Sequence, residues 1–278
     1  MIIMNNSFWY DLKLKFLKSG NPGMLYIAIN VIVFVIVGLM SLNASINEFV
    51  SYYLKFHAAS SFWLSHFYTV VTYQFLHANI FHIFFNMLVL YWVGQLLLDF
   101  IKPRQFHTIY LIGGVFGALF FAIIYNAIPY YRPFVPGSTL EGASAAVMAV
   151  FAALATLVPN YRLRLLIFGE VKIKYLLMVY IALDLLGSIS KNSGGSISHL
   201  GGAIFGFAYI KLLQNGTDLS AIFQKKAKLK VVKNQQPKQT VSQVNQREVD
   251  AILDKISQSG YDNLTKDEKE TLFKASKN

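Results

Sequence analysis

Residues Glu141–Phe151 have the sequence EGASAAVMAVF, in which one hydroxyl, that of Ser144, lies among very small residues at the start of a long apolar segment. Small residues allow membrane helices to approach one another closely. A serine in such a place is most often part of that packing, and by itself it indicates no function. A functional interpretation of Ser144 therefore needs a chemical partner elsewhere in the chain.

The composition indicates a multi-span membrane protein. Of 278 residues, 55% are hydrophobic and 14% are charged, whereas an average soluble domain carries roughly 25% charge. The net charge of +11 comes largely from flanks, connections and the tail. This distribution argues against a nucleic-acid-binding domain, and it fits the basic residues found at the cytoplasmic edge of a membrane protein. The absence of cysteine excludes disulfide and thiolate chemistry. We expect no cleavable signal peptide, because the first apolar run lacks a clear small-residue cleavage site.

Six segments are apolar enough to predict membrane spans, each of which needs about 20 such residues. They are approximately Met24–Met40, Phe75–Leu98, Phe106–Ala127, Gly142–Val158, Tyr175–Ile189 and Ile197–Leu213. Alternate connections are rich in lysine and arginine, which concentrate on the cytoplasmic side and therefore predict that both termini lie there. The basic residues that carry this prediction are Lys13, Lys15, Lys18, Lys102, Arg104, Arg162, Arg164, Lys172 and Lys174, against Lys55, Arg132 and Lys191 on the other side. The aromatic-rich external connection from Ser41 to Gln74 is expected at the membrane interface.

Polar side chains inside predicted spans are costly and indicate function. The second span carries His82 and Asn86, which lie one helical turn apart on one face. The fourth span carries Ser144 and the sixth carries His199, each about one turn from its external end. These three spans run in the same direction, so the four side chains are expected to converge at one depth.

The chemistry that fits this set is nucleophilic catalysis. A serine hydroxyl such as that of Ser144 needs a base to take its proton, and a histidine such as His199 is the usual base. Asparagine and histidine side chains can stabilise an oxyanion. Asp184 on the preceding span is a possible orienting residue for His199, but a Ser–His dyad is the simpler interpretation. The hydrolase elbow is excluded because Ala146 stands where that motif requires glycine.

Structural explanations compete with this interpretation. Ser144 alone is more often packing filler, Gly202 and Gly206 form a GxxxG pair that favours close helix packing, and His82 and Asn86 would also suit a buried hydrogen-bonded pair. Such residues would not be expected to fall in the same leaflet on alternate spans by chance, which favours the site.

A metal site would have to use His77, His82 and His199. The five-residue spacing splits the first two across a helix, and no carboxylate joins them. We therefore expect no metal and no other cofactor.

Three stretches carry a resemblance to a known family. They are TYQFLHANIFHIFFNMLVLYWVG, GASAAVMAVF and SHLGGAIFGF, in this order. With the six-span frame from about Met24 to Leu213, the chain resembles the rhomboid family of intramembrane serine proteases. The resemblance implies an all-α fold, a six-transmembrane-helix bundle over residues 1–214.

The resemblance also implies roles for individual residues. Ser144 becomes the nucleophile and His199 the general base. His82 and Asn86 become oxyanion donors together with the Ser144 amide, and His77 matches an outer histidine of more structural role. Two glycines match positions that let spans four and six touch, and these are Gly202 and Gly206.

The implied activity is that of a serine endopeptidase that cleaves the transmembrane segments of membrane proteins near their outer ends. The implied setting is a lipid bilayer, the cell inner membrane, with the site opening to the external side. Motion of span five, or of the loop near Gly194–Gly195, is a hypothesis for substrate entry. The alternative is a catalytically silent rhomboid-like protein that binds client transmembrane helices. A small-solute transporter is disfavoured because no internal repeat is found.

Two of the departures from the family pattern lie in the segment that begins with Ser144. Ala145 replaces the usual glycine after the serine, which predicts a slightly narrower site. Met148 replaces a tyrosine that often stacks near the histidine, so another residue, or none, must hold the ring of His199. Neither change removes a catalytic group.

The tail is predicted to be a polar linker, residues 215–246, followed by a small cytoplasmic helical hairpin, residues 247–278. Helical spacing of apolar residues predicts the first helix, and Thr265 with Glu268 has the spacing of a capping box at the start of the second. The apolar residues of the first helix are Val249, Ile252, Leu253 and Ile256.

Overall fold

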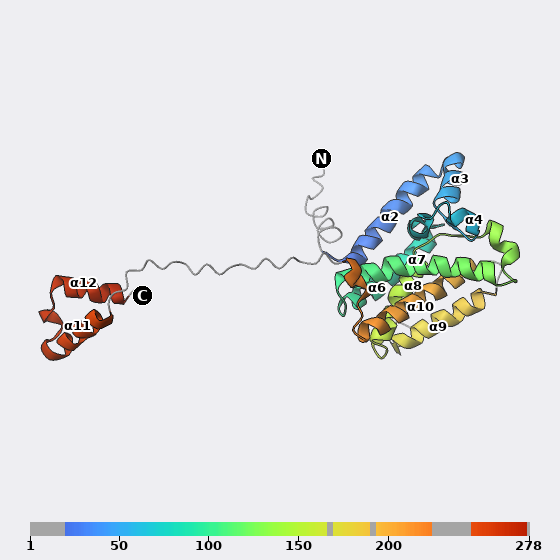
Figure 1. Ribbon diagram of the computed structural model, residues 1–278. Coiled ribbons are helices and arrows are strands. Elements are labelled where there is room, and N and C mark those ends of the chain that lie inside the picture. Colours follow the sequence, from blue (N-terminus) through green and yellow to red (C-terminus); the bar gives the residue numbers. More distant parts are fainter. Residues whose placement is uncertain (1–19, 166–168, 190–192, 224–245, 277–278) are drawn as a thin grey trace, which may run out of the picture. The chain divides into compact units, whose positions relative to one another are not determined.

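The computed structural model describes residues 20–165, 169–189, 193–223 and 246–276. The chain divides into two compact units, Met1–Gln224 and Lys225–Asn278 (Figure 1). The basic residues Lys13, Lys15, Lys18 and Lys191 and most of the predicted linker lie outside the described residues.

Four helices of the first unit are long and apolar enough to cross a membrane. They are α2 (Pro22–Met40), α6 (Ile80–Leu98), α7 (Pro103–Ala127) and α10 (Gly194–Gln214). The fourth and fifth predicted spans are also helices, α8 (Ser144–Leu157) and α9 (Ile173–Gly187), of 14 and 15 residues. These two are shorter than the roughly 20 residues of a full span, so the count of six spans stays a prediction.

Local capping chemistry sets the beginnings of these helices. The Asn21 side chain accepts a hydrogen bond from the Met24 amide at 3.1 Å, directly before Pro22 at the first helical position of α2. The Asn79 side chain accepts from the His82 amide at 2.9 Å and caps α6. Each cap satisfies an amide that the helix itself leaves unpaired, so the start of α6, and with it the position of His82, is well defined.

The short helix α8 lies at the centre of the first unit, packed between α7 and α10 (Figure 1). Every residue from Ala145 to Ala155 is buried. On the α7 side, Gly113 and Gly117 face the methyl groups of Ala149 and Ala145. A Cβ at Gly117 would lie 2.7 Å from the Ala145 methyl, so only glycine permits this spacing.

The α10 side of α8 packs by the glycines that the sequence singled out. A Cβ at Gly202 would collide with the backbone carbonyl of Ala145, and one at Gly206 with that of Ala149. The predicted close contact between the fourth and sixth segments is thereby confirmed. Small residues on three neighbouring helices bring the start of α8 against the His199 turn of α10.

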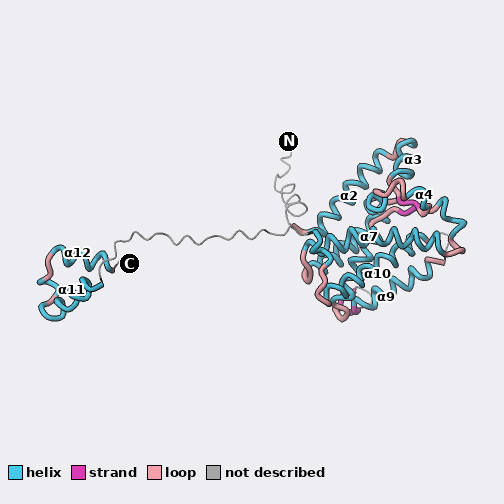
Figure 2. The backbone as a smooth tube through the Cα atoms, viewed as in Figure 1, coloured by secondary structure: helices cyan, strands magenta, loops and turns pink. Residues whose placement is uncertain are grey.

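The all-helical expectation misses two short antiparallel strand pairs (Figure 2). β1 (Phe56–His57) pairs with β2 (Thr139–Leu140), and β3 (Arg162–Leu165) pairs with β4 (Gly169–Lys172). Strands of two to four residues carry too little periodicity to be found in a sequence. The β1–β2 pair matters for the site because β2 ends directly before the turn that leads to Ser144.

Short helices fill the remaining connections of the first unit. The connection between α2 and α6 contains α3 (Ala44–Tyr53), α4 (Ser60–Trp63), α5 (Thr69–Thr72) and η2 (Tyr73–Phe75). Short 3-10 helices follow α7 and α10, namely η3 (Arg132–Gly137) and η4 (Leu219–Phe223).

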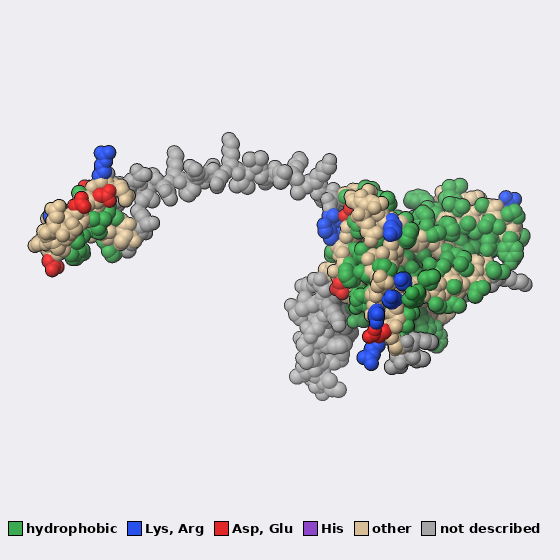
Figure 3. All heavy atoms as spheres, turned by 90° about the horizontal axis from the view of Figure 1, so that it is seen from below, with side chains coloured by type: hydrophobic (Ala, Val, Ile, Leu, Met, Phe, Trp, Pro, Cys, Tyr) green, Lys and Arg blue, Asp and Glu red, His purple; other side chains and the backbone are tan. Residues whose placement is uncertain are grey.

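Hydrophobic side chains dominate the face of the first unit in Figure 3, while most of its visible lysine and arginine side chains gather at one end. Large apolar side chains project outward from the long helices, for example Trp92 at 63% and Leu183 at 62% exposure. Exposed apolar surface of this extent marks an interaction with other apolar matter. Together with the lengths of the four helices it identifies a membrane-spanning protein.

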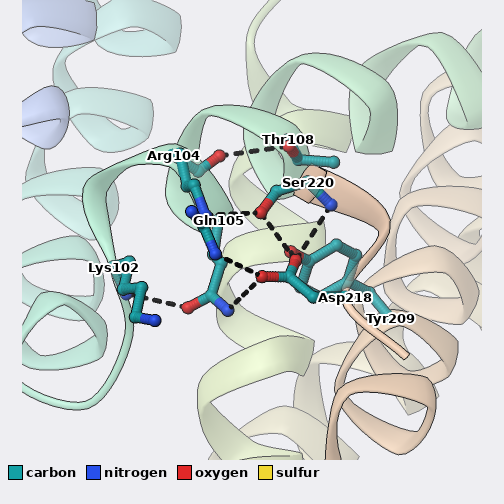
Figure 4. A network of polar contacts seen from close by, with 7 residues as sticks. All are labelled: Lys102, Arg104, Gln105, Thr108, Tyr209, Asp218 and Ser220. Atoms are coloured by element: carbon teal, nitrogen blue, oxygen red, sulfur yellow. Dashed lines mark hydrogen bonds and ion pairs between the residues drawn. The ribbon is translucent and has the colours of Figure 1, made fainter. Parts of the chain in front are cut away.

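A polar network joins the start of α7 to the segment after α10 (Figure 4). The Asp218 carboxylate accepts hydrogen bonds from Arg104 and Gln105, both at 3.0 Å, from Ser220 Oγ at 2.6 Å and from the Tyr209 hydroxyl at 3.2 Å. Desolvation raises the pKa of Asp218, but the hydrogen bonds from Ser220, Arg104 and Gln105 outweigh it and hold the pKa well below its usual range. The network fixes the end of the helix that carries His199.

The second unit is a helical hairpin of α11 (Gln246–Ser259), η5 (Tyr261–Asn263) and α12 (Lys266–Ala275). Ile252 and Leu264 are its buried apolar residues. The predicted capping box is confirmed, since the Thr265 amide donates to Glu268 Oε2 at 2.8 Å and the Glu268 amide donates to Thr265 Oγ1 at 3.4 Å. Lys255 Nζ adds an ion pair to Glu268 at 2.9 Å.

Candidate functional site

A cavity of about 570 Å³ brings together the four polar residues that the sequence singled out. Ser144, at the first position of α8, and His199, in the second turn of α10, both line it. His82 and Asn86 line it from α6. Its other lining residues are Asn79, Phe81, Phe85, Val89, Val147, Met148 and Tyr180.

The turn before Ser144 depends on glycine. Gly142 has φ +125°, a conformation that residues with a side chain rarely adopt. A Cβ there would lie 2.7 Å from His82 Nε2 and 3.7 Å from Ser144 Oγ. The imidazole of His82 therefore lies directly over the backbone that leads into Ser144.

Contacts from the preceding connection hold this turn in place. The Gly142 amide donates to the Tyr73 carbonyl at 2.9 Å, and the Ala143 amide donates to His77 Nε2 at 3.4 Å. An ion pair of 2.9 Å joins Lys55 to Glu141 beside them. His77 does not line the cavity, so its contacts support the structural role that the resemblance implies.

Asn86 is buried and shares a face of α6 with His82. Its Nδ2 donates to the His82 carbonyl at 2.8 Å, which fixes the amide group while leaving its second N–H available. An asparagine amide has two donor hydrogens, so the geometry permits a further hydrogen bond into the cavity.

His199 has an acidic partner, and it is Asp184, the possible orienting residue on the preceding helix. Its Nδ1 lies 3.0 Å from Asp184 Oδ1, and Asp184 is buried at 7% exposure. The two residues are 15 positions apart on consecutive helices, α9 and α10, and their rotation toward one another is set by packing that the sequence does not display.

The ring of His199 also has an aromatic neighbour. Tyr180, one turn before Asp184 on α9, meets it edge-on with ring centroids 6.1 Å apart at 61°. Met148 stands on α8 where a family tyrosine is common, and the aromatic contact is supplied from α9 instead. The residue that holds the ring of His199 in place of a tyrosine at position 148 is therefore Tyr180.

Ala145 does not narrow the site, so that expectation is wrong. Ala145 is fully buried, is absent from the cavity lining, and directs its methyl group at Gly117 of α7. The methyl group of Ala145 is accommodated by the absence of a side chain at Gly117, across the helix interface.

Across the described ranges, Ser144 Oγ makes no hydrogen bond to His199, although both line the cavity. Catalytic hydrogen bonds are often long before substrate binds. Within the same ranges, no group of three or more His, Cys, Asp or Glu residues is arranged to hold a metal ion.

Comparison with known proteins assigns the family. The rhomboid domain model matches residues 64–215, and this chain belongs to the rhomboid family. Residues 242–278 match a family of unknown function (DUF6576).

Curated relatives are similar over about half of this chain. The chain is 32% identical over 139 residues to the presenilin-associated rhomboid-like protein, mitochondrial, of Bos taurus and to that of Mus musculus. It is 29% identical over 140 residues to the presenilin-associated rhomboid-like protein A, mitochondrial, of Danio rerio. Each match covers 49% of this chain and 35% of the relative, so the chain spans only about a third of the length of these relatives.

Proposed function

We propose that this protein is an intramembrane serine endopeptidase that cleaves transmembrane segments of membrane proteins near their outer ends. The observation that supports it most strongly is the shared cavity, in which the hydroxyl of Ser144 and the imidazole of His199 meet two further polar side chains, those of His82 and Asn86. Four helices contribute to that cavity, so its polar composition is not a local feature of one helix.

The proposed reaction uses each of these residues in one step. Ser144 Oγ attacks the carbonyl carbon of the scissile peptide bond while His199 Nε2 takes its proton. The resulting oxyanion accepts hydrogen bonds from His82, Asn86 and the Ser144 amide. Collapse breaks the C–N bond, His199 returns the proton to the leaving amine, and water then hydrolyses the acyl-enzyme.

The cavity also restricts the substrate. Apart from the polar set its lining is apolar, with Phe81, Phe85 and Val89 on α6 and Met148 on α8. A peptide bond inside a helix is held in hydrogen bonds, so the substrate segment must unwind locally before attack. We therefore propose membrane-protein substrates with small or helix-breaking residues at the cleaved position, and the bilayer itself as the second partner.

The location in the cell is part of the proposal. The bias of basic residues supports termini in the cytoplasm and a site that opens to the external side of the cell inner membrane. The curated relatives are named as mitochondrial proteins.

Labelling with a fluorophosphonate probe tests the proposal. Detergent-solubilised wild type is compared with Ser144→Ala and His199→Ala, and the thermal unfolding of each is measured alongside. We expect labelling of the wild type alone. Equal labelling of all three folded proteins, or none in any, would contradict a serine–histidine mechanism.

A second candidate is a catalytically silent protein that binds client transmembrane helices. Two observations favour it: Ser144 and His199 share no hydrogen bond within the described residues, and the relatives bear the name rhomboid-like. In that case a membrane-protein client would be captured equally by wild type and Ser144→Ala, and the wild type would not react with the probe.

A further inference from the structure

The Asp184 carboxylate is unusual for its surroundings. It is the only acidic residue in α9, and together with Ile173 it is one of the two buried residues of that helix. Ionisable groups inside membrane proteins are costly and persist when they are paired and have a role. The partner here is His199, whose Nδ1 lies 3.0 Å from Asp184 Oδ1.

This contact selects the form of the imidazole that catalysis requires. A carboxylate only accepts hydrogen bonds, so Nδ1 of His199 must carry the proton. Nε2 is then left as the acceptor for the hydroxyl proton of the serine. Resting on the proposed function, we infer that Asp184 is a positioning residue that completes an Asp184–His199–Ser144 arrangement.

The proton transfer in this reaction involves only Asp184, His199, Ser144 and the substrate. When Ser144 Oγ bonds to the substrate carbonyl carbon, its proton moves to His199 Nε2 and the ring becomes positive. Asp184 remains a carboxylate and stabilises that charge, and the proton leaves with the amine product.

Tyr180 extends the same function of α9. It contacts the ring of His199 on one side and that of Phe151 on α8 at 6.5 Å on the other. The base is thus held from α9 by an aromatic contact and a hydrogen bond one turn apart. A consequence is that His199 is oriented only while α9 is packed against α8 and α10.

A purely structural ion pair is the competing explanation, and rates separate the two. The rate of fluorophosphonate labelling and the thermal unfolding temperature are measured for wild type, Asp184→Asn and Asp184→Glu. Leu183→Asn is the matched control, because Leu183 is a neighbouring, 62% exposed residue of the same helix. The rate is measured over a range of probe concentrations, so that the maximal rate and the half-saturating concentration are obtained separately.

We expect Asp184→Asn to slow labelling by about 100- to 10 000-fold while Leu183→Asn labels as the wild type does. Asp184→Asn should lower the maximal labelling rate while the probe concentration that gives half of that rate stays within about threefold of the wild-type value, because only the orientation of the base is lost. A structural defect of the cavity would instead change both quantities.

Wild-type labelling by folded Asp184→Asn would overturn the inference. If Asp184→Asn does not fold, Asp184→Glu decides, because it keeps the charge and displaces the carboxylate. A loss of about tenfold or more in folded Asp184→Glu supports positioning, and an unchanged rate overturns it. Failure of the wild type itself to label would instead count against the proposed function.

Discussion

Gly117 of α7 lies against the methyl group of Ala145, so close that a Cβ at Gly117 would be 2.7 Å from it. The side chain of the residue after Ser144 therefore packs against a neighbouring helix and does not enter the cavity. The packing of three helices and the position of Ser144 depend on this contact.

Gly117→Ala should destabilise the protein by about 1–3 kcal/mol, because overpacking forces the helices apart. The added methyl would meet both Ala145 and the carbonyl of Ser198, also at 2.7 Å. Thermal unfolding in detergent measures the effect. Gly38→Ala is the control, since among the described residues nothing lies within 4 Å of a Cβ there. Equal melting of the two variants would refute the packing account.

Ala145→Gly should leave the labelling rate within about threefold of wild type, because the methyl group points away from the cavity and only a small contact is lost. The measurement is the rate of probe labelling at Ser144. An increase of tenfold or more would show that the methyl obstructs the site after all.

Gly142→Ala should abolish or strongly reduce labelling while leaving most of the fold intact. The φ of +125° is unfavourable for alanine and the methyl would strike the imidazole of His82. The matched control is Gly137→Ala in η3, where a Cβ meets no described atom within 4 Å. Full labelling of Gly142→Ala would remove His82 from the catalytic interpretation.

An engineered disulfide tests whether α9 moves to admit substrate. A Cβ at Gly187 would lie 3.5 Å from that of Ser196 on α10, within the range of disulfides, and the natural chain has no cysteine. Oxidised Gly187→Cys/Ser196→Cys should label with the small probe as before but cleave transmembrane substrates at least about tenfold more slowly.

Reductant should restore cleavage by the cross-linked protein, and the Ser196→Cys single variant should behave as the wild type does. If oxidation leaves substrate cleavage unchanged, entry does not require movement of α9.

Asp218→Asn should lower stability by about 1.5–3 kcal/mol at neutral pH, since several hydrogen bonds to a charged group are weakened. The pKa of Asp218 is held below its usual range by its hydrogen bonds from Ser220, Arg104 and Gln105, which outweigh desolvation. The free energy that Asp218 contributes to folding is therefore fully present above the pKa of an aspartate in the unfolded chain, which is about 4. It is lost as the pH falls through the lower pKa of Asp218 in the folded protein.

The melting difference between wild type and Asp218→Asn should accordingly be constant from pH 8 to pH 5 and shrink in stronger acid. The exposed ion pair of Arg162 with Glu170 on β3 and β4 provides the control, and Arg162→Ala should cost less than about 1 kcal/mol. Equal effects of the two substitutions would show that the network in Figure 4 adds no special stability.

The sequence was sufficient for the helices and for the four cavity residues, because apolar length and direction of span are local properties. It indicated Asp184 only as one possibility and did not indicate Tyr180, since the rotation of α9 toward His199 is decided by packing against α8 and α10. The orientation of Ala145 was misjudged for the same reason. Whether a helix residue faces the cavity or a neighbouring helix depends on how the helices pack. The residue that faces Ala145 is Gly117 of α7, and nothing in the sequence around Ser144 indicates that contact.

If Ser144 and His199 form a working peptidase site, the protein must cleave a substrate embedded in a membrane. A protein with a single transmembrane segment is reconstituted in lipid vesicles with wild type, Ser144→Ala or His199→Ala, and the products are identified by mass spectrometry. We predict one cut near the outer end of the segment with wild type and none with either variant. The same products with Ser144→Ala, or no product with any of the folded proteins across a panel of segments, would contradict the account.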